Sequence, residues 1–193
     1  MARWEPNALG RLEQAALELY RENGFDSTTV AQIAERAGLT ERTFFRYFTD
    51  KREVLFGGTQ PLRELLVNGV AAAPEGTAPL AAVLAALEHA ADELFEPRRA
   101  LALQRQLVID ANPGLQEREL VKSASLGVAL AEALRERGVP ETVAELAGQV
   151  GIAVLHTAFG RWTRDTGEQT LAQLLRDTAA QLPAIELNPV AGG

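Results

Sequence analysis

The residues best suited to bind a charged partner lie between positions 36 and 52. Within an acidic chain of net charge −7, this stretch holds five cations and two anions, which leaves a local charge of +3. The cations are Arg36, Arg42, Arg46, Lys51 and Arg52, and the anions are Glu41 and Asp50. Electrostatic attraction acts within a Debye length of about 10 Å, so local charge matters more than the total. Because arginine binds phosphates and guanine edges, this pattern indicates nucleic acid as the partner.

The segment GLTERTFFRYF, residues 38–48, is expected to form a helix with two different faces. Phe44 and Phe48 are four residues apart, so they share one face, which we expect to be buried. Two further pairs with the same spacing are Arg42 with Arg46 and Thr43 with Tyr47. We expect these pairs to face solvent, where arginines and hydroxyl groups commonly contact phosphates.

The elements that position this segment have the spacing of a helix-turn-helix. Ala34 is small, Gly38 tolerates a positive φ in the turn, and Phe44 supplies an apolar anchor on the second helix. Two short helices that cross at about 90–120° need these residue types where they touch. Thr29 is expected to open the first helix in a capping box with the glutamine three residues later, and Thr40 to cap the second.

The rest of the chain also has helical patterns, so the predicted fold class is all-α. Apolar residues recur at spacings of three and four, and no segment shows the sustained alternation of a strand. One helix is expected to begin at Asp50, as its N-cap, with Glu53 at the third position. Further helices are expected at 61–73, 78–95, 97–111, 114–137, 140–165 and 168–182. Residues 185–193, which end in NPVAGG, are expected to be a disordered tail.

Residues 9–56 resemble the DNA-binding domain of the tetracycline-repressor (TetR) family of transcriptional regulators. The resemblance is carried by AALELYRENGFDSTTVAQIAERAGLTERTFFRYFTDKREVLF, and above all by its IAERAG core, its TFFRYF motif and the lysine that follows. It implies a helix-turn-helix DNA-binding domain at 1–53, in a three-helix arrangement. It also implies a helical bundle at 54–184 that binds a ligand and forms a homodimer.

The resemblance further implies which side chains contact DNA. The family's usual DNA-contacting positions fall at Thr29, Thr40, Arg42, Thr43, Phe45, Arg46, Tyr47 and Lys51. Phe45 stands where the family usually has a tyrosine, so the hydroxyl that could bond a phosphate is missing and only an apolar contact remains. Lys51 is expected to share a phosphate with the amides of the helix beginning beside it.

The distal helices are expected to form the dimer interface, through residues 140–165 and 168–182. Residues 140–162 are apolar on almost every side, which indicates burial against both the core and a partner. A strip of small residues is expected to allow close helix approach there: Ala144, Gly148, Gly151, Leu155 and Ala158. Leucines at three- and four-residue steps in 171–182 would complete a four-helix dimer bundle. The alternative is that both helices pack only within one chain.

A ligand site in the distal bundle is less distinct in the sequence. The candidate residues are Gln106, His156, Phe159 and Trp162. A single histidine on an apolar helix is more often a core residue than a ligand contact, so that alternative stays open for His156. Because leucines far outnumber polar groups in this region, the expected effector is a small, largely apolar molecule.

Several function classes are disfavoured by the sequence. The chain contains no cysteine and only two histidines, without the spacing of a metal site, and it has no phosphate-binding loop or nucleophile elbow. We therefore expect no catalytic residues, no metal and no cofactor. No apolar run reaches about 18 residues and no signal peptide is evident, so a cytoplasmic protein without a membrane span is expected.

These observations favour a ligand-responsive transcriptional regulator that binds a palindromic operator in double-stranded DNA. Most members of the TetR family are repressors, which is the basis for expecting repression rather than activation. The alternative is a helical small-molecule-binding or scaffold protein that does not bind DNA.

Overall fold

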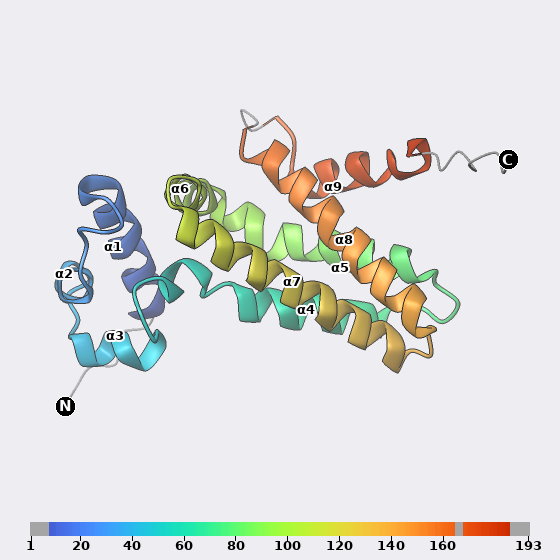
Figure 1. The fold of residues 1–193 in the computed structure, drawn as a ribbon, viewed down its shortest axis with the longest axis horizontal. Coiled ribbons are helices and arrows are strands. Elements are labelled where there is room, and N and C mark those ends of the chain that lie inside the picture. The colour runs from blue at the N-terminus through green and yellow to red at the C-terminus, as the bar shows by residue number, and fades with distance from the viewer. Residues whose placement is uncertain (1–7, 165–167, 186–193) are drawn as a thin grey trace, which may run out of the picture. The chain divides into compact units, whose positions relative to one another are not determined.

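The computed structural model describes residues 8–164 and 168–185, and this part of the chain contains helices and no strand. The predicted all-α class is therefore confirmed. The α-helices, traced in Figure 1, are α1 (Ala8–Asn23), α2 (Val30–Arg36), α3 (Glu41–Tyr47), α4 (Thr59–Ala72), α5 (Pro79–Ala90), α6 (Arg99–Asp110), α7 (Pro113–Glu136), α8 (Glu141–Trp162) and α9 (Leu171–Ala179). Shorter 3₁₀ or π turns are η1 (Glu53–Phe56), η2 (Ala91–Phe95), η3 (Glu96–Arg98) and η4 (Leu182–Ala184).

The chain divides into two compact units. The first, unit 1, comprises residues 1–61 and 98–122, and the second, unit 2, comprises residues 62–97 and 123–193. Helices α4 and α7 therefore contribute residues to both units. Residues 98–122 pack with the N-terminal helices, although they follow them by more than forty positions in the chain. We use the name reading head for residues 8–56 of unit 1.

The reading head contains the predicted helix-turn-helix. Thr29 forms the expected capping box at the start of α2, and Thr40 caps α3 by accepting a hydrogen bond from the Thr43 amide. Gly38 has a φ of +65°, which a side chain would disfavour, so the turn between the two helices needs glycine. Phe44 is fully buried, in a core whose other members include Leu12, Ala16, Ile33 and Phe48 from the reading head and Ile109 and Leu115 from α6 and α7.

The helix expected to begin at Asp50 is not formed as predicted. Asp50 does cap the next turn, but this turn is the short 3₁₀ segment η1, and the continuous helix α4 begins only at Thr59. Gly57 and Gly58 separate the two, and glycine is a poor helix former. A side chain at Gly57 would meet Glu13 and Phe48 within 3.3 Å, so the chain passes close to α1 at this point.

Unit 2 is built around α8, which packs against α5 and α9. We had expected the strip of small residues on α8 to lie in the contact with a second subunit. In the structure it does not form an outer face. All five of its members are buried within the chain: Ala144, Gly148, Gly151, Leu155 and Ala158. An added Cβ at Gly151 would lie 2.4 Å from Val83 of α5, and one at Gly148 would lie 2.6 Å from the carbonyl oxygen of Gly127 of α7. The strip therefore allows close helix packing inside unit 2.

The leucine face of α9 is also used inside the chain. Leu171, Leu174 and Leu175 are buried, and the helix begins with a capping box between Thr170 and Gln173. The side of α9 that faces solvent is polar instead. The expected disordered tail falls largely on residues 186–193, which lie outside the described residues.

By length and composition alone, helix α8 could cross a membrane, because an 18-residue stretch of it has a mean hydropathy of 1.3. The sequence had led us to expect no such segment. A helix in the interior of a folded bundle passes the same test, and α8 has nine buried residues packed inside unit 2. This packing explains the apolar residues on the buried side of α8, whereas Val143 and Leu146 are exposed.

Candidate nucleic-acid interface

Helix α3 presents the predicted reading residues on its solvent side. Arg42 and Arg46 are exposed, and no hydrogen bond or ion pair joins Arg42 to another described residue. Arg46 donates a hydrogen bond to the Tyr47 hydroxyl at 3.1 Å, and its guanidinium lies 4.9 Å from the centre of the Tyr47 ring. Phe45 is 55% exposed, which is unusual for a phenylalanine that has a core within reach. This face therefore offers two cations and two aromatic rings to a partner.

The threonines named from the sequence lie at the helix starts, where their hydroxyls cap the backbone. The Thr29 hydroxyl accepts from the Gln32 amide at 3.3 Å, and the Thr40 hydroxyl accepts from the Thr43 amide at 3.2 Å. The Thr40 and Thr43 hydroxyl oxygens are 3.0 Å apart, so one donates to the other. Thr29 and Thr40 remain exposed, but their hydroxyl oxygens already accept hydrogen bonds from backbone amides.

Arg36 does not belong to the outward cationic face. Its guanidinium pairs with Glu22 of α1 at 2.8 Å and approaches Glu18 at 3.5 Å. Hydrogen bonding with Arg36 lowers the pKa of Glu22 from its usual value. The local charge of +3 read from the sequence is therefore partly neutralised within the reading head, and the cations left near α3 are Arg42, Arg46, Lys51 and Arg52.

Lys51 follows α3 but does not lie at the start of a continuous helix as expected, and its ammonium group points to the turn between α1 and α2. The Nζ atom donates to the carbonyl oxygens of Phe25 at 2.7 Å, Asp26 at 3.0 Å and Thr28 at 2.9 Å. It also lies 4.6 Å from the centre of the Phe25 ring. A lysine has three N–H donors, so all of them are used within the turn between α1 and α2.

The backbone around Lys51 is fixed from the other side. The Tyr20 hydroxyl donates to the Lys51 carbonyl oxygen at 2.6 Å. Burial, and secondarily the negative charge of Asp50, raise the pKa of Tyr20, so this hydroxyl keeps its proton. The Asp50 carboxylate accepts from the backbone amides of Arg52 at 2.7 Å and Glu53 at 3.1 Å. Burial alone would raise the pKa of Asp50, but these amides and the Arg52 charge lower it.

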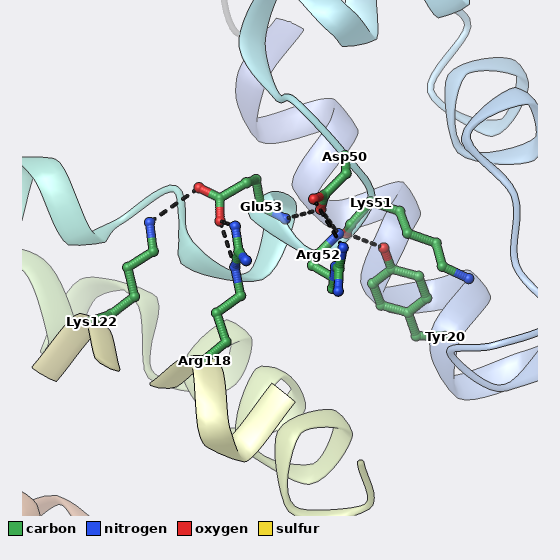
Figure 2. A network of polar contacts seen from close by, with 7 residues as sticks. All are labelled: Tyr20, Asp50, Lys51, Arg52, Glu53, Arg118 and Lys122. Carbon is green, nitrogen blue, oxygen red and sulfur yellow. Dashed lines mark hydrogen bonds and ion pairs between the residues drawn. The ribbon is translucent and has the colours of Figure 1, made fainter. Parts of the chain in front are cut away.

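Glu53 connects the reading head to α7, as Figure 2 shows. Its carboxylate accepts from Arg118 Nε at 2.8 Å, also from the second nitrogen of that guanidinium, and from Lys122 Nζ at 3.2 Å. Burial opposes ionisation of Glu53, but hydrogen bonds from both cations and their charges lower its pKa below the usual value. The carboxylate is therefore ionised at neutral pH and bound by two cations of α7.

Two more arginines strengthen the attachment of residues 98–122 to the reading head. Arg98 pairs with Glu13, whose side chain is largely buried in α1. Arg105 donates to the Leu55 carbonyl oxygen and pairs with Glu119 at 2.9 Å. Sequence reasoning missed these pairs, because the partners are 14 to 85 residues apart and no local pattern links them.

A hollow of about 460 Å³ lies beside the exposed ring of Phe45. It is lined by Phe25, Val30, Phe45, Thr49, Asp50, Lys51 and Arg52. The hollow joins the turn before α2, the outer side of α3 and the segment that follows α3. These are the three parts of the reading head that the sequence had linked to one partner.

Comparison with known proteins agrees with this geometry. Residues 13–56 match the model of the tetR family of bacterial regulatory proteins, a segment that contains α2, α3 and η1. Over these residues the chain belongs to the TetR family. The regulator TcmR of Streptomyces glaucescens is 33% identical over 132 residues, which are 66% of this chain and 58% of TcmR. The regulator BetI of Escherichia coli is 38% identical over 74 residues, which are 36% of this chain and 38% of BetI. The matches thus span roughly two fifths to three fifths of these relatives.

Two solved structures share the fold over nearly the whole chain. The Thermus thermophilus repressor FadR, in complex with lauroyl-CoA, is 27% identical with a TM-score of 0.56, and the match covers 96% of this chain and all of that one. SmeT in complex with triclosan is 19% identical with a TM-score of 0.61, and the match covers 96% of this chain and 98% of that one. The SmeT match supports the fold alone.

The four candidate ligand residues are distributed over both units. Gln106 belongs to unit 1, where its Nε2 donates to Asp110 at 2.7 Å and its buried Oε1 accepts from no described residue. Trp162 of unit 2 is fully buried, and its indole donates to Glu96 at 3.0 Å. Phe159 packs beside Trp162, with ring centres 5.5 Å apart, whereas His156 is exposed. Their role in ligand binding stays a prediction.

Proposed function

We propose that this TetR-family chain is a ligand-responsive transcriptional regulator, a repressor, that binds a palindromic operator as a homodimer. The observation that carries this proposal is the outward face of α3, where Arg42 is exposed and unpaired among the described residues. A surface arginine on the second helix of a helix-turn-helix is placed to enter the major groove. Residues 1–53 would bind DNA, and residues 54–184 would bind the effector and the second subunit.

The side chains on this face have distinct roles in the proposal. Arg42 and Arg46 read guanine edges or contact phosphates, and the Tyr47 and Thr43 hydroxyls contact phosphates. Phe45 makes an apolar contact. Thr29 and Thr40 approach the DNA backbone at the starts of α2 and α3, where their capping hydroxyls hold the helices in place.

The proposal is tested by gel retardation with DNA from upstream of the protein's own gene. Arg42→Ala is expected to weaken operator binding by about 1–3 kcal/mol, roughly 5- to 150-fold, and to relax the preference at one base pair. Arg63→Ala serves as the matched control, because Arg63 lies on unit 2 and only approaches Glu132 at 3.8 Å. If the parent protein binds no duplex from its own region, the alternative of a helical ligand-binding or scaffold protein is favoured.

The effector is proposed to be a small, largely apolar molecule that releases the operator. The structural neighbour FadR supports an apolar group in the effector, since FadR binds lauroyl-CoA, whose acyl chain is apolar. Release requires the effector to prefer the conformation that does not fit DNA, so operator DNA must reciprocally weaken effector binding. The candidate contacts are Gln106, His156, Phe159 and Trp162.

The homodimer is proposed to form through the solvent-exposed sides of α8 and α9. Leu146, which is 61% exposed, and Val143 lie on α8 without a place in the core, and Ala153 and His156 are exposed further along the same helix. Burying such a face against a second copy would remove apolar surface from water. The polar outer side of α9 would then form the rim of the contact.

We expect Ala153→Arg to convert the dimer to a monomer, because a bulky charge would be placed on the exposed side of α8. Sedimentation of the parent and the variant at micromolar concentration measures this. Arg63→Ala is the control, since Arg63 lies on α4, outside the two helices of the proposed contact. A parent protein that sediments as a monomer contradicts the proposed dimer.

The proposed location is the cytoplasm, without a membrane span, because α8 is packed inside unit 2. Among the described residues, no group of three histidine, cysteine or acidic side chains could hold a metal ion. The proposal assigns the chain no catalytic role.

A further inference from the structure

We infer that Lys51 is a positioning residue of the reading head, and that Arg52 is the cation of this segment that contacts a DNA phosphate. The inference rests on the proposed binding of DNA. It departs from the simplest reading of the sequence, in which the lysine after α3 reaches the phosphate itself. The difference comes from the directions in which the two neighbouring side chains extend.

The ammonium group of Lys51 has no donor left for a phosphate. Its three N–H groups point to the carbonyl oxygens of Phe25, Asp26 and Thr28, at 2.7 to 3.0 Å. These carbonyls follow the end of α1, where the chain turns through Gly24 at a φ of +82°. A phosphate contact would require at least one of these charge-assisted hydrogen bonds to break, and such bonds are stronger than neutral ones.

The main chain of Lys51 is held as well, which limits how far the side chain can move outward. Tyr20 donates to the Lys51 carbonyl oxygen, and Asp50 accepts the amides of the next two residues. Figure 2 shows the Lys51 amine extending away from the Asp50 carboxylate, on the side of Tyr20. Lys51 thus joins the segment after α3 to the turn before α2, from its side chain and from its backbone.

This connection fixes the start of α2. The turn that Lys51 holds ends at Thr28, one residue before Thr29 caps α2. The Thr28 hydroxyl in turn donates to the Gly24 carbonyl oxygen at 2.8 Å, so the turn is closed by side chains at both ends. Loss of the Lys51 ammonium would remove the charged donor from three carbonyl oxygens, of which that of Phe25 would keep the Thr28 amide at 3.4 Å, and would loosen residues 25–29.

Arg52 has the opposite environment. Its side chain is 53% exposed, and its described ion-pair partner is Asp50, at a distance of 3.5 Å. A guanidinium has five N–H donors, so most of them remain available to a phosphate. The ion pair with Asp50 orients the Arg52 side chain and leaves most of its N–H donors free. Arg52 also lines the hollow beside Phe45, as Lys51 does, so the free donors rather than the position distinguish the two cations.

The test compares Lys51→Met with Arg52→Met, because methionine keeps the length of the aliphatic stem and removes the charge. Operator affinity is measured over a range of salt concentrations for the parent and both variants. Each phosphate contact contributes about 0.9 to the slope of log affinity against log salt. Arg52→Met should lower the slope by about one per subunit, whereas Lys51→Met should weaken binding with an unchanged slope.

Hydrogen exchange in the DNA-free protein gives a second readout, which does not depend on DNA binding. Lys51→Met should speed amide exchange in residues 25–30, and Arg52→Met should leave it unchanged. The inference is overturned if Lys51→Met lowers the salt slope, if Arg52→Met does not, or if exchange in residues 25–30 is unaffected by Lys51→Met. If the parent binds no duplex DNA, the proposed function fails, and the exchange result alone decides the role of Lys51.

Discussion

Gly148→Leu is expected to lower the free energy of unfolding by about 3 kcal/mol or more. The Cβ of any side chain at this position would lie 2.6 Å from the Gly127 carbonyl oxygen and 3.3 Å from the Ala131 amide nitrogen. Both atoms belong to the backbone of α7, so no rotation of a side chain can relieve the clash. Leucine favours the helix more than glycine does, so any loss of stability reports the contact between α7 and α8.

Gly114→Leu is the matched control for this prediction. Gly114 lies in the first turn of α7, and a Cβ there would meet no atom within 4 Å. The Gly114→Leu variant is expected to be as stable in urea as the parent, or slightly more stable. If Gly148→Leu unfolds at the same urea concentration as the parent, α7 and α8 do not pack as closely as described.

The second large effect is expected at Glu53, where reversal of the charge should destabilise the protein by about 3 kcal/mol. Glu53→Arg would place a third cation beside Arg118 and Lys122 and remove the acceptor that both use. The side chains are about one fifth to one third exposed, so solvent screens part of the repulsion. Thermal or urea unfolding of the parent and the variant measures the difference.

A double variant in which the charges of Glu53 and Arg118 are swapped tests whether the two side chains interact directly or whether the loss reflects net charge. Adding Arg118→Glu to Glu53→Arg should recover part of the lost stability, because the pair is restored in reverse orientation. Glu53→Gln keeps the shape of the side chain and should cost less, about 1 kcal/mol. A double variant as unstable as the sum of the single changes would contradict a direct interaction.

The same carboxylate gives the stability a dependence on pH. Because the pKa of Glu53 is lowered in the folded protein, its contribution is fully present above the pKa of the unfolded chain. The contribution is lost as the pH falls through the lower, folded pKa. The difference in stability between the parent and Glu53→Gln should therefore shrink in this acidic range and stay constant near neutrality.

The attachment of residues 98–122 to the reading head bears on how an effector would act. Glu53, Glu13 and the Leu55 carbonyl are bound by cations from this segment, so the segment and the reading head form one compact unit. We expect a displacement of the first half of α7 to carry the reading head with it. Weakening the Glu53 pair should then reduce the effect of an effector on operator affinity, even where DNA binding itself is retained.

The helix-turn-helix and its two faces could be predicted from the sequence alone. Residue types at short spacings decide these features, because they depend on contacts within one or two helical turns. Thr29, Thr40 and Gly38 take the predicted caps and turn, and Phe44 is buried as expected. The outward direction of Arg42 and Arg46 follows from the same periodicity.

The contacts of the other side chains could not be predicted in this way, because they depend on packing between distant segments. The small residues of α8 could line a dimer contact or an internal one, and periodicity cannot distinguish two apolar surroundings; the structure places Gly148 and Gly151 inside unit 2. Lys51 and Arg52 are adjacent cations that look alike in the sequence. One is directed to three carbonyl oxygens 23 to 26 residues earlier, and the other extends to solvent. Such contacts depend on how distant segments pack, which no local pattern records.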